Sequence, residues 1–313
     1  MYKSEIDLSV LIIFFARPST LKETFEQVKK ARPSMLFLAC DGPRNEEEAK
    51  RVEECKKIVN DIDWECEVYR NYSEENKGCG RGPSEAISWA FGYTDKLLIL
   101  EDDCVANPTL FPFIKENLDR YENDDRIGVI SGFNHLKEWD VASDSYFYTK
   151  TGATLGWGTW KRVWENFDYN VSGIENARSE KLLRKELINK RVGAMRVHDW
   201  KKANLETHEK KVNYWDVQFG FVKYSMSYLT VVPKYNLIYN NGVGEGSTHT
   251  AKAKYKEWKK GQILFMPTKE LEFPLKHPEH IICDRDYDEE VFKILYPKKW
   301  KRILRKIKRK ILG

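Results

Sequence analysis

Three consecutive acidic residues, Glu101, Asp102 and Asp103, follow an apolar run at 97–100. Carboxylate oxygens gathered in this way can bind Mg²⁺ or Mn²⁺, and these cations can bridge to phosphate oxygens. The same residues also suit an acidic surface turn ahead of a capped helix at 108–109, where Asp and Asn are ordinary neighbours. Taken alone, the triplet leaves a metal-diphosphate site and a capped turn as two alternatives.

A second segment that could bind a ligand, residues 76–83, is glycine-rich and basic. Its glycines would let the backbone approach a ligand closely, and Lys77 and Arg81 could contact phosphate. The segment has neither the GxxxxGK spacing of a Walker loop nor the GxGxxG spacing of a dinucleotide-binding turn. By itself it favours a flexible connection with solvated charges over a phosphate site.

Further candidates lie in the second half of the chain. Asp216 falls in the first turn of a predicted helix, where an acid either complements the helix dipole or serves as a general base. His249 lies in a polar, glycine-containing loop at 240–249 and could reach metal or diphosphate, although a single His there is more often solvated. Trp157, framed by glycines, either stacks on a sugar or plugs the core.

The elements that would position these residues alternate over the first 131 positions. Short apolar runs predict strands at 9–15, 35–40, 64–69, 97–100 and 127–131. Helices are predicted after them, opened by Thr20 with Glu23 and by Asn45 with Glu48. Alternation of this kind predicts an α/β fold with a mostly parallel sheet flanked by helices. The triplet would lie at the carboxyl edge of that sheet, where such folds bind ligands.

The second half is less regular and richer in aromatic residues. Aromatic side chains at helical spacing over 160–167 predict a helix packed in the core. A charged surface helix is expected over 175–190, with Leu182, Leu183 and Leu187 facing inward. A late strand is expected at 229–232.

Composition narrows the class of protein. The chain of 313 residues is 41% hydrophobic and 13% aromatic, which is enough to bury a sizeable core. Its six cysteines are scattered without a CxxC pair, so neither a zinc site nor a disulfide framework is supported, and a reducing cytoplasm fits best. We identify no secretion signal and no transmembrane segment.

The net charge of +5 is unevenly distributed along the chain. Residues 298–313 contain nine Lys or Arg and no acid, which leaves 44 basic against 48 acidic residues elsewhere. A mildly acidic body is not the footprint of a nucleic-acid-binding surface. The tail has the pattern of a basic amphipathic helix, for which we favour an anionic membrane surface over docking on its own domain.

Five segments in order resemble nucleotide-sugar transferases of the GT-A fold, in particular the N-acetylglucosaminyltransferase I branch and related bacterial sugar transferases. The segments are IIFFARPSTLKETFEQV at 12–28, CDGPR at 40–44, NKGCGRGPSEAISWAF at 76–91, LLILEDDCVANPTLF at 97–111 and YWDVQF at 214–219. The resemblance covers most of the first 131 residues and samples the remainder thinly.

The resemblance implies contacts with the nucleotide sugar. Arg17 and Asp41 match positions that hold the nucleotide base or its ribose. Arg81 would contact the donor, and Asp102 matches a position that contacts ribose or the donor sugar. Glu101 would join this donor-binding group. The implied partner is therefore a nucleotide-sugar donor.

The resemblance also implies a metal and a base. Asp103 matches the carboxylate that binds the divalent cation, which would be Mn²⁺ or Mg²⁺. His249 would be a second ligand of the metal or of the diphosphate. Asp216, after Trp215, matches the catalytic base of the family.

The implied domain layout is a GT-A catalytic domain over 1–297 followed by the basic tail at 298–313. The nucleotide-sugar half would span about 7–131 and the acceptor half about 132–260. The implied activity is metal-dependent, inverting transfer of a sugar, from a UDP-sugar in preference to others, to a hydroxyl of a glycan or lipid-linked glycan precursor in bacterial surface polysaccharide synthesis.

This chain lacks the N-terminal anchor of the animal enzymes in that branch, so we expect a cytoplasmic protein that is peripheral on the inner face of the membrane. Two alternatives are a sugar-nucleotide nucleotidyltransferase and a non-catalytic nucleotide-sugar-binding protein of the same fold.

Overall fold

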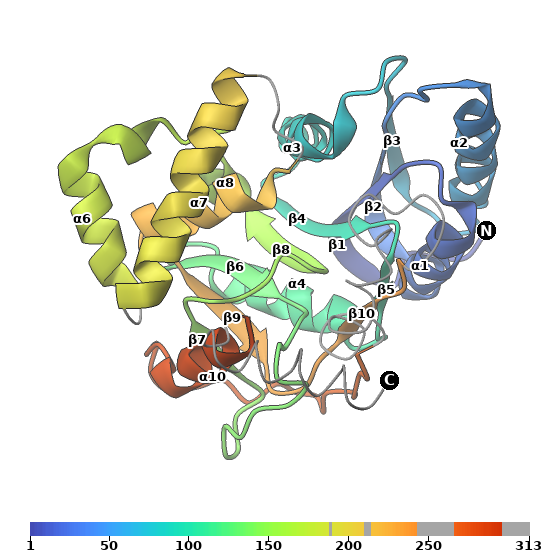
Figure 1. Cartoon of the computed structure of the whole chain (residues 1–313). Coiled ribbons are helices and arrows are strands. Elements are labelled where there is room, and N and C mark those ends of the chain that lie inside the picture. The colour runs from blue at the N-terminus through green and yellow to red at the C-terminus, as the bar shows by residue number, and fades with distance from the viewer. Residues whose placement is uncertain (188–189, 210–213, 243–265, 296–313) are drawn as a thin grey trace, which may run out of the picture.

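Four parallel strands form the first half of the main sheet in the computed structural model, which describes residues 1–187, 190–209, 214–242 and 266–295 (Figure 1). They are β1 (Ile6–Phe14), β2 (Pro33–Cys40), β3 (Glu67–Tyr72) and β4 (Lys96–Glu101), paired in the order β3-β2-β1-β4. The apolar runs of β1, β2 and β4 are covered by helices on both faces, as in other parallel sheets. The prediction of an α/β fold is confirmed.

The sheet continues beyond β4 with four more strands. They are β8 (Trp157–Trp160), β6 (Ile127–Ser131), β9 (Leu229–Pro233) and β7 (Tyr146–Thr149), in that order. β8 is antiparallel to both of its neighbours, β4 and β6. β6 and β9 are parallel to each other, and β7 pairs with β9 in the antiparallel direction. The sheet is therefore mixed and mostly parallel. A small second sheet pairs β5 (Cys104–Ala106) with β10 (Ile238–Asn240).

Helices pack on both faces of the sheet (Figure 1). One face carries α1 (Pro18–Ala31), α2 (Glu46–Val59) and α4 (Leu110–Arg120), whereas α3 (Gly78–Ala90) and α8 (Asp216–Ser225) lie on the other. The other described helices are α5 (Lys161–Trp164), the 3₁₀ turn η1 (Ser172–Glu175), α6 (Ala177–Glu186), α7 (Lys190–His208) and α10 (Arg285–Leu295). Within the described ranges, no helix is both long and apolar enough to cross a membrane.

Local signals explain where the first two helices begin. Asn45 caps α2 by accepting a hydrogen bond from the Glu48 amide at 2.9 Å, as predicted. The predicted start of α1 at Thr20 is wrong, because the helix begins at Pro18 and the Thr20 hydroxyl donates to the Arg17 carbonyl. Proline suits this first position, where its missing N–H has no helical partner.

The second half differs more from expectation. The charged helix expected over 175–190 is present as the shorter α6. Of the three leucines expected to face inward, Leu183 and Leu187 are buried, whereas Leu182 is 57% exposed. Asn176 caps the start of α6, since its side chain accepts from two amides in the first turn of this helix. α5 is a single short turn, so the helix predicted over 160–167 is wrong in extent.

Trp157 belongs to the core. It is only 1% exposed within β8, and its ring stacks on that of Trp215 at a centroid separation of 5.7 Å. Of the two interpretations of Trp157, plugging the core is therefore the correct one. His249 and the tail at 298–313 lie outside the described residues.

Candidate functional site

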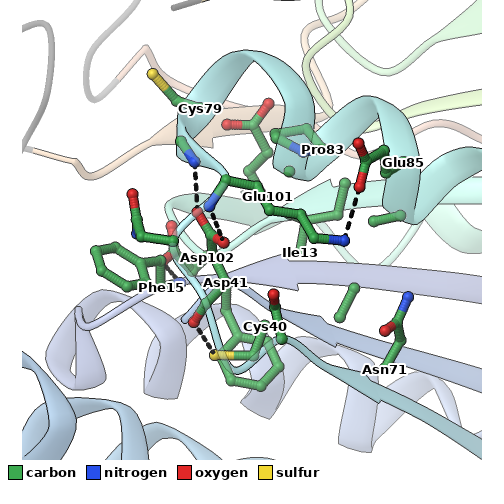
Figure 2. A pocket seen from close by; sticks show the side chains of 18 of the residues that line it. Ile13, Phe15, Cys40, Asp41, Asn71, Cys79, Pro83, Glu85, Glu101 and Asp102 are labelled. Atoms are coloured by element: carbon green, nitrogen blue, oxygen red, sulfur yellow. Dashed lines mark hydrogen bonds and ion pairs between the residues drawn. The ribbon is translucent and has the colours of Figure 1, made fainter. Parts of the chain in front are cut away.

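A pocket opens where the chain reverses direction across the sheet. From β1 the chain moves outward to β2 and β3, then returns through α3 to β4 on the other side of β1. Such a reversal leaves a crevice at the carboxyl ends of the strands, which is where open α/β sheets bind ligands. A cavity of about 210 Å³ lies there, lined from these strand ends and from the start of α3 (Figure 2).

Asp102 is tied to the end of β1. Its Oδ2 accepts from the Phe15 amide at 2.9 Å and from Arg17 Nε at 3.3 Å, while its Oδ1 accepts from Arg17 Nη2. Arg17 Nη1 also donates to Asp103 Oδ2 at 2.9 Å. The guanidinium of Arg17 therefore links Asp102 and Asp103, two of the three residues of the acidic triplet.

The charges of this group are strongly coupled. Burial, together with the charges of Asp103 and Asp102, raises the pKa of Glu101 to about 8, which favours the protonated carboxyl. Burial also raises the pKa of Asp102 to about 6, against the opposing effect of Arg17. For Arg17 itself, burial disfavours the charge, but the two aspartates outweigh it and raise its pKa.

Asp103 is enclosed from a second direction by the segment that follows β10. The Asn241 amide donates to the Asp103 carbonyl at 3.0 Å, which extends the pairing of β10 with β5. A Cβ added at Gly242 would lie 2.3 Å from Asp103 Oδ2, closer than any real contact. Only glycine fits here without displacing the Asp103 carboxylate.

The fit of a divalent cation depends on Asp103. Its carboxylate is a suitable hard ligand, but Oδ2 is already hydrogen-bonded to Arg17. Over the ranges that the structure describes, no group of three or more His, Cys, Asp or Glu side chains could hold a metal ion. These residues do not form a preassembled metal site, so Mn²⁺ or Mg²⁺ and the role of His249 stay predictions.

Asp41 organises the loop above the pocket. Its Oδ1 accepts from the amides of Gly42 at 3.0 Å and Lys77 at 2.8 Å, and its Oδ2 accepts from Gly78 at 2.8 Å (Figure 2). Gly78 has a φ of +76°, which glycine adopts readily. Asp41 lines the pocket, but its oxygens bind backbone here, and a nucleotide contact stays a prediction.

The glycine-rich segment at 76–83 is not a flexible loop. α3 begins at Gly78, and Pro83 lies inside the helix. Arg81 does not line the pocket, because it lies over the Tyr169 ring, with 5.6 Å between the guanidinium carbon and the ring centroid. Its proposed donor contact remains untested.

Three cations do line the pocket, namely Arg17, Arg44 and Lys77. Arg44 pairs with Glu48 and lies 5.5 Å from the centroid of the Phe15 ring. The sequence pattern did not single out Arg44, although it lies in the CDGPR segment directly after β2. Its position at the carboxyl end of a strand was the available signal.

Asp216 approaches from α8. It is exposed at the first position of that helix and is not among the pocket-lining residues. Its charge nevertheless contributes, after burial and closer charges, to the raised pKa values of Glu101 and Cys79. Figure 2 shows Glu101 beneath the helix that carries Cys79. The charge of Asp216 therefore acts on Glu101, although the Asp216 side chain is exposed and does not line the pocket.

No family model matches this chain, and no curated protein matches it. Among solved structures, a UDP-glucose pyrophosphorylase complexed with UDP-glucose has a TM-score of 0.36 and 9% identity, covering 80% of this chain and 99% of that one. The inositol-1-phosphate CTP transferase from T. maritima has a TM-score of 0.33 and 11% identity, covering 51% and 74% of the respective chains. These TM-scores are too low to carry an argument about fold or activity.

Proposed function

We propose that this chain is a glycosyltransferase that takes its sugar from a nucleoside-diphosphate sugar. The observation that supports this function best is the convergence of Arg17, Arg44 and Lys77 on a pocket at the point where the strand order reverses. A diphosphate needs positive groups of this kind, and guanidinium groups match phosphate geometry well.

In the proposed transfer reaction, some residues bind the donor and one acts as the base. The three cations bind the diphosphate, and the Phe15 ring at the rim offers a face for the base. Asp216 takes the proton from an acceptor hydroxyl, whose oxygen then bonds to the anomeric carbon. The bond from that carbon to the diphosphate oxygen breaks, and the nucleoside diphosphate leaves with the electron pair. One displacement from the opposite side inverts the anomeric configuration.

The acceptor and the location remain parts of the proposal. We expect a hydroxyl of a glycan or lipid-linked glycan precursor, a UDP-sugar donor and a peripheral association through the basic tail. Divalent cations are expected to act with the donor, through Asp103. The alternative is nucleotidyl transfer. UDP-glucose pyrophosphorylase and CTP transferase are names of enzymes that catalyse reactions of this class.

Product analysis separates these two activities. Glycosyl transfer releases a nucleoside diphosphate from a nucleotide sugar, whereas nucleotidyl transfer joins a nucleoside triphosphate to a sugar phosphate and releases pyrophosphate. Purified protein is incubated with UDP-, GDP- and dTDP-sugars and glycan acceptors, or with nucleoside triphosphates and sugar phosphates, and the released nucleoside diphosphate and pyrophosphate are quantified. Pyrophosphate release without nucleoside diphosphate would replace our proposal with the alternative.

The base assignment is tested with Asp216→Asn. This variant should lose transfer by at least about a hundredfold while nucleotide affinity stays close to wild type, because general-base catalysis contributes ~10²–10⁴-fold. Asp286→Asn is the matched control, since Asp286 is also an exposed acid in the first turn of a helix, α10. Asp216→Asn with most of its activity intact would remove Asp216 from the mechanism.

A further inference from the structure

The acidic triplet already binds a positively charged group of the same chain, the guanidinium of Arg17. Arg17 contacts both oxygens of Asp102 and, through Nη1, one oxygen of Asp103 at 2.9 Å. The side chains of the two aspartates are 2% and 12% exposed, so this pairing is largely shielded from water. A shielded guanidinium held by two carboxylates is strongly bound, because screening is weak there.

The surroundings of Asp103 leave little room for a second cation. Arg17 Nη1 lies 2.9 Å from Oδ2, and the Gly242 backbone passes so close to that same oxygen that an added Cβ would lie 2.3 Å from it. The Cys104 thiol lies 3.8 Å from Oδ1. A divalent ion such as Mg²⁺ must approach an oxygen to about 2.1 Å while keeping several waters. That approach to Oδ2 requires Arg17 to leave.

We propose that Arg17 is a resident cation that blocks Asp103, and that it must turn from Asp103 to an anionic ligand before a divalent cation can bind there. Arg17 lines the pocket as well as the triplet, so it can exchange a carboxylate for a phosphate without leaving the site. The inference rests on the proposed function only for the identity of that ligand, a nucleoside diphosphate.

The proposal has a thermodynamic consequence. Because Arg17 and the cation compete for Asp103, a diphosphate that draws Arg17 away strengthens cation binding. By linkage, the cation must strengthen diphosphate binding by the same factor. Divalent cations should therefore bind the nucleotide-free protein weakly.

Binding of Mn²⁺ to the full-length protein, followed by the EPR signal of the free ion, tests this competition directly. Without nucleotide, Arg17→Gln should bind one Mn²⁺ at least about tenfold more tightly than wild type. Adding Asp103→Asn to that variant should remove the gain. Arg32→Gln is the matched control, because it removes the same charge from an ion pair with Glu5 that lies outside the pocket lining. It should bind Mn²⁺ as wild type does.

Wild-type protein supplies the second measurement, which is independent of any effect of Arg17→Gln on folding. Measured against protein-free mixtures, because UDP and pyrophosphate also chelate Mn²⁺ in solution, UDP should tighten Mn²⁺ binding to wild type by at least about tenfold, and inorganic pyrophosphate should act in the same direction. The proposal is overturned if nucleotide-free wild type binds Mn²⁺ tightly at a site that Asp103→Asn abolishes, or if folded Arg17→Gln binds it no better than wild type. Failure of UDP to bind would instead count against the proposed function. The Mn²⁺ titrations without nucleotide would still test whether Arg17 blocks Asp103.

Discussion

At the scale of single residues, the fold buries the lysine Lys223 with contacts that only partly compensate for the loss of its hydration. Lys223 in α8 is 5% exposed, and its Nζ donates to the Gly152 carbonyl at 2.5 Å. Burial, together with the charges of Arg196 and Lys150, lowers the pKa of Lys223 to about 7 against the opposing effect of Asp288. A lysine in this state is neutral in the folded protein well below the pH at which it is neutral in the unfolded chain.

The pH dependence of stability should report this lysine. Between pH 7 and about pH 9.5, the unfolded chain holds a proton on Lys223 that the folded chain has released, since the ordinary pKa is about 10.4. Stability must then rise with pH. Relative to Lys223→Met, the free energy of unfolding of wild type should rise by up to ~1.4 kcal/mol per pH unit. Urea unfolding at several pH values measures both.

Lys293→Met is the control for that comparison. Lys293 lies in α10 with a side chain that is 60% exposed, and its partner Glu290 is exposed too. Between pH 7 and about pH 9, removing it should leave the slope of stability against pH unchanged, because the raised pKa of Lys293 lies above this range. Parallel curves for wild type and Lys223→Met would mean that Lys223 stays charged in the folded protein.

At the scale of elements, the first four strands were predictable and the start of α3 was not. β1, β2 and β4 are short apolar runs, and burial on both faces requires that composition whatever the rest of the chain does. β3 is the least regular of the four strands, because it has no fully buried residue, begins at Glu67 on the sheet edge and was expected from residue 64. The start of α3 is set by Asp41, which lies 37 residues before Gly78. No local pattern reveals a cap supplied from that distance.

The same reasoning separates the predictable part of the site from the rest. Parallel strands end at one edge, so proximity of Arg17 and Asp41 to the acidic triplet follows from strand order. The pairing of β10 with β5, which brings Gly242 against Asp103, depends on two segments far apart in sequence. α7 was missed because its apolar residues are not confined to one face of the helix, which leaves a weak helical pattern.

The distant cap of α3 leads to a prediction about this element. Asp41→Asn replaces an acceptor-only carboxylate with an amide that can present a donor to the Lys77 and Gly78 amides. We expect a loss of ~1–3 kcal/mol and faster hydrogen exchange of the amides at the start of α3. Both are measured by urea unfolding and by hydrogen-deuterium exchange.

A local cap provides the comparison for that experiment. Asn45→Ala removes the cap of α2 and should cost ~1 kcal/mol, with faster exchange confined to the first turn of α2. Asp41 would have no role in capping if Asp41→Asn left exchange at the start of α3 unchanged.

At the scale of the whole molecule, the pocket and the last described helix lie at different parts of the sheet. The pocket is at the ends of β1 to β4, whereas α10 packs beside β7 at the opposite edge (Figure 1). Asp288 fixes α10 there, because its buried carboxylate accepts from the Thr149 and Thr151 hydroxyls and from the Lys150 amide. This anchor shares no residue with the pocket, so a ligand should order one region without altering local motion in the other.

Nucleotide binding tests that division. At a hundred times its dissociation constant, UDP should stabilise the fold by ~2.7 kcal/mol and raise its melting temperature. At short labelling times, hydrogen exchange should slow at Phe15, Arg17 and 76–79, which line the pocket, and stay unchanged over α10. Uridine at the same concentration should protect much less, because it lacks the diphosphate that Arg17, Arg44 and Lys77 would bind. Equal protection by uridine would show that these cations do not hold a diphosphate, and protection centred on α10 would place the nucleotide elsewhere.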